Sequence, residues 1–233
     1  MAAYSPHNPH EMTPVFSPEA LWVHEGMGFR EALDRLAKQG DLKATLLLVA
    51  LTHFASKGYD GVQVREVAEE AGVSKPTLYY HFGSKEGLFR QLCLVAHSVL
   101  EHRMEAAVAP VLLETWADDA AVEDAAYRIA KGYVNLLMET PEFTGFVLRS
   151  IAVPSPDSGF RDLMPLVERT IAPVGRFIHQ AFGIDFDQAR KEMMIFTGIF
   201  GALMEERIRR PEYAIDETEL RWAVRRWIRG LRA

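Results

Sequence analysis

Residues 67–82 read VAEEAGVSKPTLYYHF, and this stretch decides how the first part of the chain folds. Apolar Val67 and Ala68 precede Gly72, which interrupts the helical pattern, and Ser74 stands where the N-cap of a further helix is expected. Two short helices joined by a tight turn that contains glycine have the layout of a helix-turn-helix. We expect Gly72 to adopt a positive φ, which costs glycine little.

The sequence on either side of this stretch extends the helical pattern. Asp41 is a good N-cap for a helix over 41–58 that Gly58 would end, and Ser84 can cap a longer helix after a break at Gly83. The sequence therefore predicts three helices between residues 41 and 85, of which the second and third are short. We expect their small core to contain Val64, Val67, Val73, Leu78 and Phe82.

The other face of the segment that begins at Ser74 has no acidic side chain. It offers hydroxyls, ammonium groups and an imidazole, which are donors that reach the phosphates and base edges of DNA. The whole chain has a formal net charge of −6, and residues 41–90 hold six Lys/Arg and six Asp/Glu, so the positive charge of this face is local. Taken alone, Tyr79 and Tyr80 could equally be core aromatics. The face contains Ser74, Lys75, Pro76, Thr77, Tyr79, Tyr80, His81 and Lys85.

The run over 67–82, followed by SKEGLF at 84–89, resembles the DNA-binding domain of the TetR family of transcriptional regulators. The resemblance covers about residues 41–92. It implies a homodimer that binds a palindromic operator in double-stranded DNA and is released by a small-molecule ligand. It also implies a helical domain after the DNA-binding segment that binds the ligand and holds the dimer together.

The resemblance implies roles for single residues. Lys75, Pro76 and Thr77 would face bases, and Pro76 would touch a thymine methyl group. Tyr79 and His81 would contact the phosphate backbone or nearby bases. The full set of DNA-binding residues that we expect is Gln63, Arg65, Ser74, Lys75, Pro76, Thr77, Tyr79, Tyr80, His81 and Lys85.

The start of the first short helix departs from the family pattern. Gln63 and Val64 stand where a Thr/Ser pair is usual in the family. Gln63 can still donate to a phosphate but Val64 cannot, so we expect one phosphate contact per subunit to be weak or missing. Lys85 would pair with a phosphate, and Arg65 would reach a guanine or a phosphate or remain a solvated surface charge.

The remainder of the chain also has a helical pattern, interrupted by prolines, and no strand-like alternation stands out. We expect an all-α fold, with a three-helix helix-turn-helix DNA-binding domain at 41–85 followed by a helical-bundle ligand-binding and dimerisation domain at 86–233. Residues 1–40 are expected to form an arm, partly disordered with a short helix, and Met27 is an alternative start. The later helices are expected near 117–139, 142–152, 159–182, 186–208 and 217–231, with a loop at 153–159.

Two late segments are the expected dimer interface. The first, 186–208, has small residues that would allow close helix approach, and the second, 217–231, has an apolar stripe. The alternative is that these helices pack only within one subunit. The residues expected in the interface are Gly198, Gly201, Ala202, Leu220, Val224, Trp227 and Ile228.

A ligand pocket is expected among the helices that precede the dimer segments. Its candidate lining is rich in methionine and aromatic side chains, which favours an apolar or aromatic ligand. Each of these residues could instead be ordinary core. The candidates are Met104, Trp116, Tyr133, Leu137, Met138, Phe146, Phe177 and Phe196.

Several other functions are disfavoured by the sequence. Cys93 is the single cysteine, so no intrachain disulfide is expected, and the chain shows neither a secretory signal nor a membrane-spanning run, which together predict a cytoplasmic protein. His97 and His102 are poorly spaced for a metal site, and no cofactor or catalytic motif is recognised. The main alternative is a ligand-binding or sequestering protein with a vestigial DNA-binding domain. An enzyme is a distant third possibility.

Overall fold

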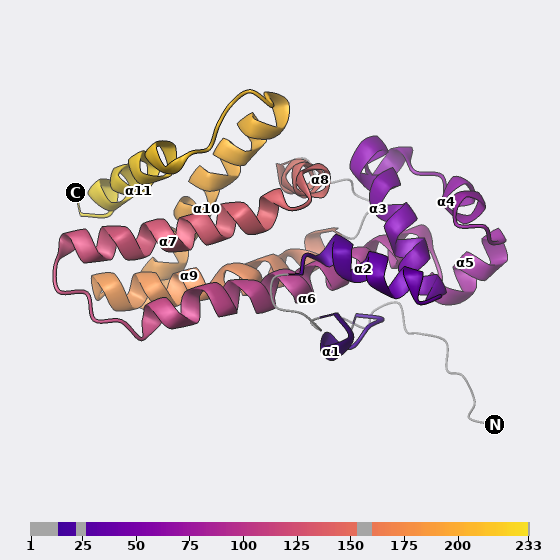
Figure 1. Cartoon of the computed structure of the whole chain (residues 1–233), viewed down its shortest axis with the longest axis horizontal. Helices are drawn as coiled ribbons and strands as arrows, with labels where there is room; N and C mark the ends of the chain where they lie inside the picture. Colours follow the sequence, from indigo (N-terminus) through magenta and orange to yellow (C-terminus); the bar gives the residue numbers. More distant parts are fainter. Residues whose placement is uncertain (1–13, 22–26, 153–159, 233) are drawn as a thin grey trace. The chain divides into compact units, whose positions relative to one another are not determined.

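The computed structural model of the chain describes residues 14–21, 27–152 and 160–232, and within these ranges it contains helices and no strand. The expected all-α class is thereby confirmed (Figure 1). The loop expected at 153–159 lies outside the described residues. The helices are α1 (Pro18–Leu21), α2 (Phe29–Lys38), α3 (Leu42–Gly61), α4 (Val64–Glu70), α5 (Lys75–Phe82), α6 (Lys85–Leu112), α7 (Asp119–Met138), α8 (Pro141–Ala152), the 3-10 turn η2 (Phe160–Leu163), α9 (Met164–Phe182), α10 (Phe186–Arg209) and α11 (Glu217–Leu231).

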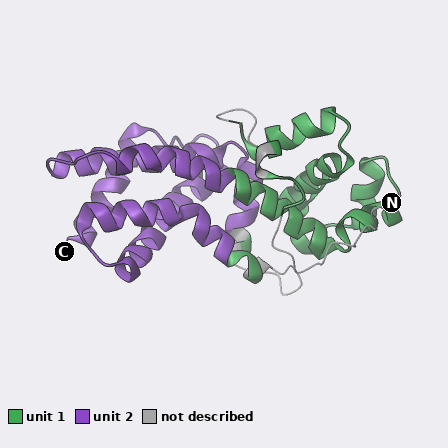
Figure 2. Cartoon of the chain, turned by 90° about the horizontal axis from the view of Figure 1, so that it is seen from below, with its two compact units in different colours: residues 1–99, 149–164 green, residues 100–148, 165–233 purple. Residues whose placement is uncertain are grey.

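The chain divides into two compact units (Figure 2). Unit 1 comprises residues 1–99 and 149–164, and unit 2 comprises residues 100–148 and 165–233. Helix α6 begins in unit 1 and ends in unit 2. The expected boundary between the DNA-binding and ligand-binding domains therefore falls inside unit 1, at the first turn of α6.

Side-chain caps begin the main helices of unit 1 where the sequence predicts them. The Asp41 carboxylate accepts a hydrogen bond from the Ala44 backbone N–H at 3.0 Å, and Ser84 Oγ accepts one from the Gly87 N–H at 2.9 Å. The end of α3 differs from the prediction. Gly58 has a φ of +71° and interrupts the helical geometry, but the chain makes a further turn and α3 extends to Gly61.

Aromatic rings form the centre of unit 1. The ring centroids of Phe54 and Phe89 are 5.2 Å apart, and those of Tyr59 and Phe89 are 5.3 Å apart. These contacts join α3 to the beginning of α6. Four of the five predicted core residues, Val64, Val67, Leu78 and Phe82, are buried, and Val73 is half-buried.

The described part of the expected N-terminal arm is packed against unit 1. Phe16 and Leu21 are buried, and the Val15 N–H donates to Oε1 of Gln91 on α6 at 2.8 Å. Helix α2 buries Phe29, Ala32 and Leu33, and it lies against α3 (Figure 1). The arm therefore includes two helices and adds apolar core to unit 1. The remainder of the expected arm, residues 1–13 and 22–26, lies outside the described residues.

The core of unit 2 is built by α7, α9, α10, α11 and the end of α6. Phe196 on α10 lies at its centre, with ring centroids 4.8 Å from Phe200 and 4.9 Å from Trp227. The Trp227 Nε1–H donates to a carboxylate oxygen of Glu192 at 3.2 Å, so the indole is anchored at both its apolar and its polar end.

Ion pairs fix α11 along α7 within unit 2. Arg225 pairs with Glu123 at 2.7 Å, and Arg221 pairs with Asp124 at 3.2 Å. The Arg221 guanidinium also lies 3.9 Å from the centroid of the Tyr127 ring. These contacts set the rotation of α11, which turns its apolar stripe toward the core.

Candidate nucleic-acid interface

The turn between α4 and α5 fixes the position of α5. The Val73 N–H donates to the Ala68 carbonyl at 2.9 Å, and the Gly72 N–H donates to the Glu69 carbonyl at 3.1 Å. Gly72 has a φ of +71°, as expected from the sequence. This pair of hydrogen bonds with a left-handed glycine is the Schellman motif, which ends α4 sharply. The buried methyl group of Ala68 allows the close approach of the two helices.

The first turn of α5 is closed by a side-chain cap. Ser74 Oγ accepts from the Thr77 N–H at 3.3 Å and lies 2.8 Å from Thr77 Oγ1. Pro76 occupies an early helical position that needs no hydrogen-bond donor. The Ser74 hydroxyl therefore serves the helix start, and Thr77 is positioned by it.

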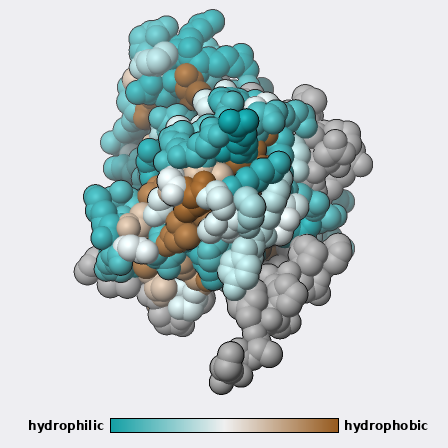
Figure 3. Space-filling view, turned by 90° about the vertical axis from the view of Figure 1, so that its right-hand side faces the viewer, coloured by the Kyte–Doolittle hydropathy of each residue, from teal (hydrophilic) through white to brown (hydrophobic). Residues whose placement is uncertain are grey.

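Helix α5 has a buried face and an outward face. Leu78 and Phe82 are buried, whereas Tyr79 is 36% exposed and Tyr80 is 60% exposed, so Tyr80 is not a core aromatic. Figure 3 views the side of the chain on which α4 and α5 lie, and hydrophilic residues cover most of that surface. Of the other candidates near α5, Ser74, Lys75 and Pro76 are exposed, and Thr77, His81 and Lys85 are half-buried.

The cations near α5 already have partners within the chain. Lys85 Nζ donates to the Asp60 carbonyl at 3.2 Å and lies 4.7 Å from the centroid of the Tyr59 ring. Arg65 pairs with Glu69 at 2.6 Å, and the pKa of Arg65 is raised by that hydrogen bond. A phosphate must displace these partners. The exchange costs little for Arg65, because exposed ion pairs are worth only about 0–1 kcal/mol.

Lys75 lies on the outward face of α5 and contacts another residue of the same helix. Its Nζ lies 5.4 Å from the centroid of the Tyr79 ring, four residues further along the helix. The two side chains therefore form one amphipathic surface, with a positive charge above an aromatic ring.

His81 lies at the end of α5 beside the start of α3. Its Nδ1 is buried and has no hydrogen-bond partner among the described residues. Burial lowers the pKa of His81, and the positive charge of Lys43 lowers it further, while Asp41 acts in the opposite direction. The imidazole is therefore biased toward its neutral form. Lys43 adds a cation near this surface that the sequence interpretation missed, because only the fold brings residues 43 and 81 together.

The start of α4 shows the effect of the unusual Gln63–Val64 pair. Gln63 occupies the N-cap position, is exposed, and makes no side-chain cap. Val64 is buried in the small core. The first turn of α4 therefore lacks the hydroxyl cap that serine or threonine would supply, while Gln63 still presents an amide at the surface.

The expected ligand-pocket residues lie mostly in the core of unit 2. The Trp116 and Phe177 rings meet edge to face at 5.3 Å, and burial raises the pKa of Tyr133 well above its usual value. The Trp116 Nε1–H is buried without an acceptor among the described residues. A ligand bound here would have to separate packed side chains. Met104, Tyr133, Phe177 and Phe196 are buried in this core, Trp116, Leu137 and Met138 pack against it half-buried, and Phe146 is buried apart from it.

The expected dimer residues separate into two groups. The α11 stripe of Leu220, Val224, Trp227 and Ile228 is buried within one subunit, so these side chains are not available to a partner. The stripe packs within its own subunit, because α11 turns it toward the core of its own unit, and the dimer interface itself stays a prediction. Gly201 is also buried, and a Cβ there would lie 3.5 Å from Leu148.

The exposed apolar surface of α10 lies on another face. Gly198 and Ala202 are exposed there, together with Met194 at 56% and Ile195 at 52% exposure. On α11 the exposed apolar residue is Trp222, at 59%. Met194 and Ile195 flank the small residues that the sequence interpretation placed in the interface, whereas Trp222 was not expected there. An apolar pattern alone does not show which of two apolar faces has a partner inside the chain.

Within the part of the chain that the structure describes, no group of three or more His, Cys, Asp or Glu residues could hold a metal ion. None of the described helices is both long enough and apolar enough to span a membrane. Cys93 is buried, and burial raises the pKa of its thiol.

Comparison of the sequence with known proteins identifies the segment around α4 and α5. Residues 46–92 match the family model of the bacterial regulatory proteins, tetR family. The biofilm operon icaADBC HTH-type negative transcriptional regulator IcaR of Staphylococcus aureus is 38% identical over 50 residues, which cover 22% of this chain and 27% of IcaR. IcaR of Staphylococcus epidermidis is 34% identical over 50 residues, with the same coverage. The match thus spans about a quarter of the length of these curated relatives.

Solved structures extend the similarity beyond this segment. A putative transcriptional regulator of Pseudomonas aeruginosa PAO1 has a TM-score of 0.64 at 18% identity and covers 85% of this chain and 93% of its own. A putative tetR family regulator of Shewanella sp. PV-4 has a TM-score of 0.62 at 22% identity and covers 82% and 97%. FadR of Bacillus subtilis in complex with stearoyl-CoA has a TM-score of 0.57 at 14% identity and covers 80% and 97%.

These structures share the fold through both units of the chain, and the matched segment contains all of α4 and α5. Residues 46–92 therefore resemble the bacterial regulatory proteins of the tetR family, and the chain shares the fold of these solved regulators.

Proposed function

We propose that the chain is a DNA-binding transcriptional regulator that acts in the cytoplasm as a homodimer on a palindromic operator. The observation that carries this proposal is the outward face of α5. It is fixed by a Schellman turn and a serine cap, has no acidic side chain, and presents Lys75, Tyr79 and Tyr80 to solvent. Rigid placement of hydroxyls and cations on one short helix suits contact with the major groove.

A dimer supports this function because one short helix offers a small contact area. A two-fold arrangement presents two copies of α5 and matches a palindromic site. The exposed apolar face of α10, with Met194, Ile195, Gly198 and Ala202, supplies the surface for a partner subunit. The small residues in this face favour close helix approach.

Repression and release by a ligand complete the proposal. IcaR is named a negative regulator, and this supports a repressor. FadR of Bacillus subtilis is described with stearoyl-CoA, and this supports a small-molecule effector, here an apolar or aromatic one that enters the core of unit 2 near Trp116 and Phe177. A ligand that binds better to the form with low DNA affinity lowers operator binding by its differential binding free energy alone.

The test compares the protein's own upstream DNA with a scrambled sequence of equal length at physiological salt. We expect a clear preference for the upstream DNA and a steep loss of affinity with added salt. Thr77→Ala and Tyr80→Ala should weaken specific binding, whereas Arg226→Gln, an exposed change on α11, should not. Equal affinity for both DNAs would exclude an operator in that region. If selection from a pool of random sequences also yielded no sequence that binds more tightly than the others, the proposed function would be overturned.

A second candidate is a ligand-binding or sequestering protein whose DNA-binding segment is vestigial. It is favoured by the internal partners of Arg65 and Lys85 and by the missing hydroxyl at Val64. The double variant Tyr79→Ala/Lys85→Ala distinguishes the two functions. A regulator loses operator binding and keeps its affinity for its ligand, while a sequestering protein shows no change in DNA binding.

A further inference from the structure

A groove lies between α9 and α10, and its lining includes neither Trp116 nor Phe177, near which the ligand of the proposed regulator is expected. Its volume is about 520 Å³, within the range of small-molecule sites. The floor consists of Ala172, Gly175, Ala189 and Met193. A Cβ at Gly175 would lie 3.3 Å from the Met193 sulfur, so the glycine keeps the floor low and apolar at this point.

One end of the groove has an aromatic wall. Phe186 lines the groove and is 66% exposed, which is a large exposure for phenylalanine. Its ring is stacked on the His179 ring, with centroids 4.0 Å apart and an interplanar angle of 20°. The His179 Nδ1–H donates to the Ile184 carbonyl at 2.6 Å, which fixes the imidazole behind Phe186. The second face of the phenyl ring is thus held ready for another flat group.

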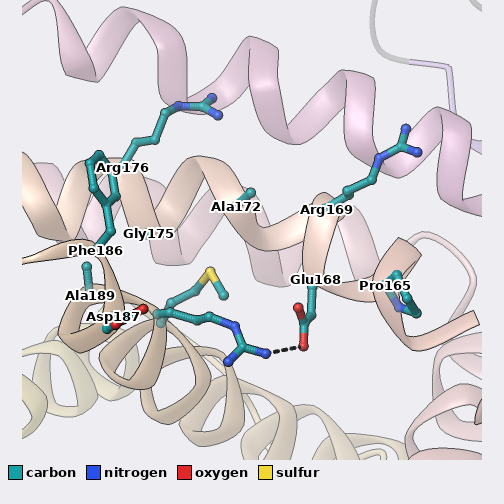
Figure 4. A pocket seen from close by; sticks show the side chains of 11 residues that line it. Pro165, Glu168, Arg169, Ala172, Gly175, Arg176, Phe186, Asp187 and Ala189 are labelled. Atoms are coloured by element: carbon teal, nitrogen blue, oxygen red, sulfur yellow. Dashed lines mark hydrogen bonds and ion pairs between the residues drawn. The ribbon is translucent and has the colours of Figure 1, made fainter.

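Three arginines line the groove, and each pairs with a carboxylate. Arg176 lies at the same end as Phe186, and Arg169 lies further along α9 (Figure 4). Arg169 pairs with Glu101 on α6 at 2.7 Å, and Arg176 pairs with Glu105 on α6. On the other side, Arg190 of α10 pairs with Glu168 of α9 at 2.6 Å.

The lining has an excess of positive charge on a chain that is acidic overall. Its charged members are Arg169, Arg176 and Arg190 against the carboxylates Glu168 and Asp187, whereas the chain as a whole has a net charge of −6. The competing carboxylates on α6 stand outside the groove. An incoming anion therefore finds a locally cationic rim above an apolar floor.

Exchange of the partner of Arg176 costs little. The side chains of Arg176 and Glu105 are 44% and 52% exposed, and such a solvent-exposed pair contributes only about 0–1 kcal/mol. Glu105 regains water when it is released, and a guanidinium can hold a new carboxylate through two parallel hydrogen bonds. A ligand that pairs with Arg176 and also makes apolar contacts should therefore bind Arg176 in preference to Glu105.

We propose that this groove binds a small aromatic carboxylate, with its ring against Phe186 and Met193 and its carboxylate paired with Arg176 in place of Glu105. The aromatic wall selects a flat body, the apolar floor buries it, and the arginine selects an acid over its neutral amide. Since Glu105 belongs to α6, occupation of the groove removes one tie between α6 and α9.

The test titrates the full-length protein with 2-naphthoate and, separately, with 2-naphthamide by isothermal calorimetry at pH 7.5. We expect the acid to bind with a Kd of about 1 mM or below and about fivefold more tightly than the amide. Arg176→Gln should abolish the preference for the acid. Phe186→Ala should weaken both compounds, because it removes the wall that they share.

The substitution Glu105→Gln gives the sharpest result, because it should strengthen binding of the acid by removing the competitor of the ligand. Glu101→Gln is its matched control, since it opens the same kind of pair one turn earlier, at Arg169, and should change binding less. The substituted side chains are well exposed, so the variants should fold. The exposed fractions are 44% for Arg176, 52% for Glu105, 33% for Glu101 and 66% for Phe186.

Three outcomes overturn the proposal. In the first, neither compound binds at millimolar concentration. In the second, the acid binds equally well to the wild type and to the Arg176→Gln and Glu105→Gln variants. In the third, Phe186→Ala or Arg176→Gln changes a dimer into a monomer in analytical ultracentrifugation, which would assign the groove to an interface between copies of the chain. None of these measurements requires DNA, so the failure of this proposal and the failure of the proposed regulatory function are distinguishable.

Discussion

Helices α5 and α11 are both amphipathic, but they are held in opposite ways. Helix α5 has eight residues and is anchored by two buried side chains, Leu78 and Phe82, with a serine cap at its start. Helix α11 has fifteen residues and buries a stripe of five, among them Trp227, while ion pairs tie its flanks to α7. Most of the side chains of α5 thus remain outside the core.

This difference separates stability from recognition. The outward residues of α5 contribute little to folding, so their identity is available for contacts with a partner. The stripe of α11 stabilises unit 2 and leaves only exposed residues such as Trp222 for a partner. Substitutions on the two helices should therefore affect different measurements.

The largest expected effect is on α11. Trp227→Ala removes a ring that contacts Phe182 and Phe196, and it should lower the free energy of unfolding by about 3–5 kcal/mol. Urea denaturation followed by circular dichroism measures the change. Trp222→Ala is the matched control on the same helix and should change stability by less than about 0.5 kcal/mol. Equal losses in the two variants would contradict the assignment of the stripe to the core.

The next-largest effect is expected on α5, where substitutions on the buried face and on the outward face should change different properties. Leu78→Ala should destabilise the chain by about 2–4 kcal/mol, since the side chain is fully buried. Tyr80→Ala should leave unfolding unchanged and weaken operator binding about tenfold, which corresponds to 1.4 kcal/mol. Denaturation and fluorescence anisotropy with labelled operator are measured on both variants. A loss of stability in Tyr80→Ala would place this ring in the core after all.

The helix-turn-helix was predictable because local chemistry dictates it. Gly72 must turn with a positive φ, Ser74 must cap, and Leu78 and Phe82 recur at helical spacing, so neighbouring residues alone determine the structure. The helices of unit 2 were predictable for the same reason. Asp118, Asp185 and Asp216 cap α7, α10 and α11 within two residues of the expected starts.

What the sequence left open is decided by contacts between distant residues. The α11 stripe has the pattern of an interface and of a core alike, and only the position of α7, fixed by pairs such as Arg225–Glu123, decides between them. The effect of the Lys43 charge on the pKa of His81 also depends on two segments far apart in the chain. The groove at Phe186 likewise forms between two different helices. Periodicity predicts which face is apolar and does not identify what covers it.

A smaller effect is expected from the turn before α5. Gly72→Ala places a Cβ on a residue with a φ of +71°, and it should lower the free energy of unfolding by about 1–2 kcal/mol. Gly230→Ala, in the last turns of α11 with open space around it, should be neutral or stabilising by a few tenths to about 1 kcal/mol. The same substitution thus has opposite signs in the two regions. A stabilising Gly72→Ala would mean that the turn does not constrain α5.

The smallest expected effect is the pH dependence of His81. Because the folded chain lowers the pKa of this imidazole, the unfolded chain takes up the proton more readily. The contribution to stability is therefore fully present above the ordinary histidine pKa of about 6.5 and is lost as the pH falls through the lower value of the folded state. His81→Gln should remove this slope from urea denaturation measured between pH 7.5 and 5.5.

Operator binding should depend on pH in the opposite direction. Phosphates near the end of α5 favour the charged imidazole and oppose the influence of Lys43, so the complex holds the proton more readily than the free protein does. Affinity should therefore rise by a factor of about two to three between pH 7.5 and 6, and this rise should be absent in His81→Gln. Anisotropy titrations at constant ionic strength measure both proteins. If the variant shows the same rise as the wild type, His81 lies outside the phosphate field, and the DNA contact ends before the last turn of α5.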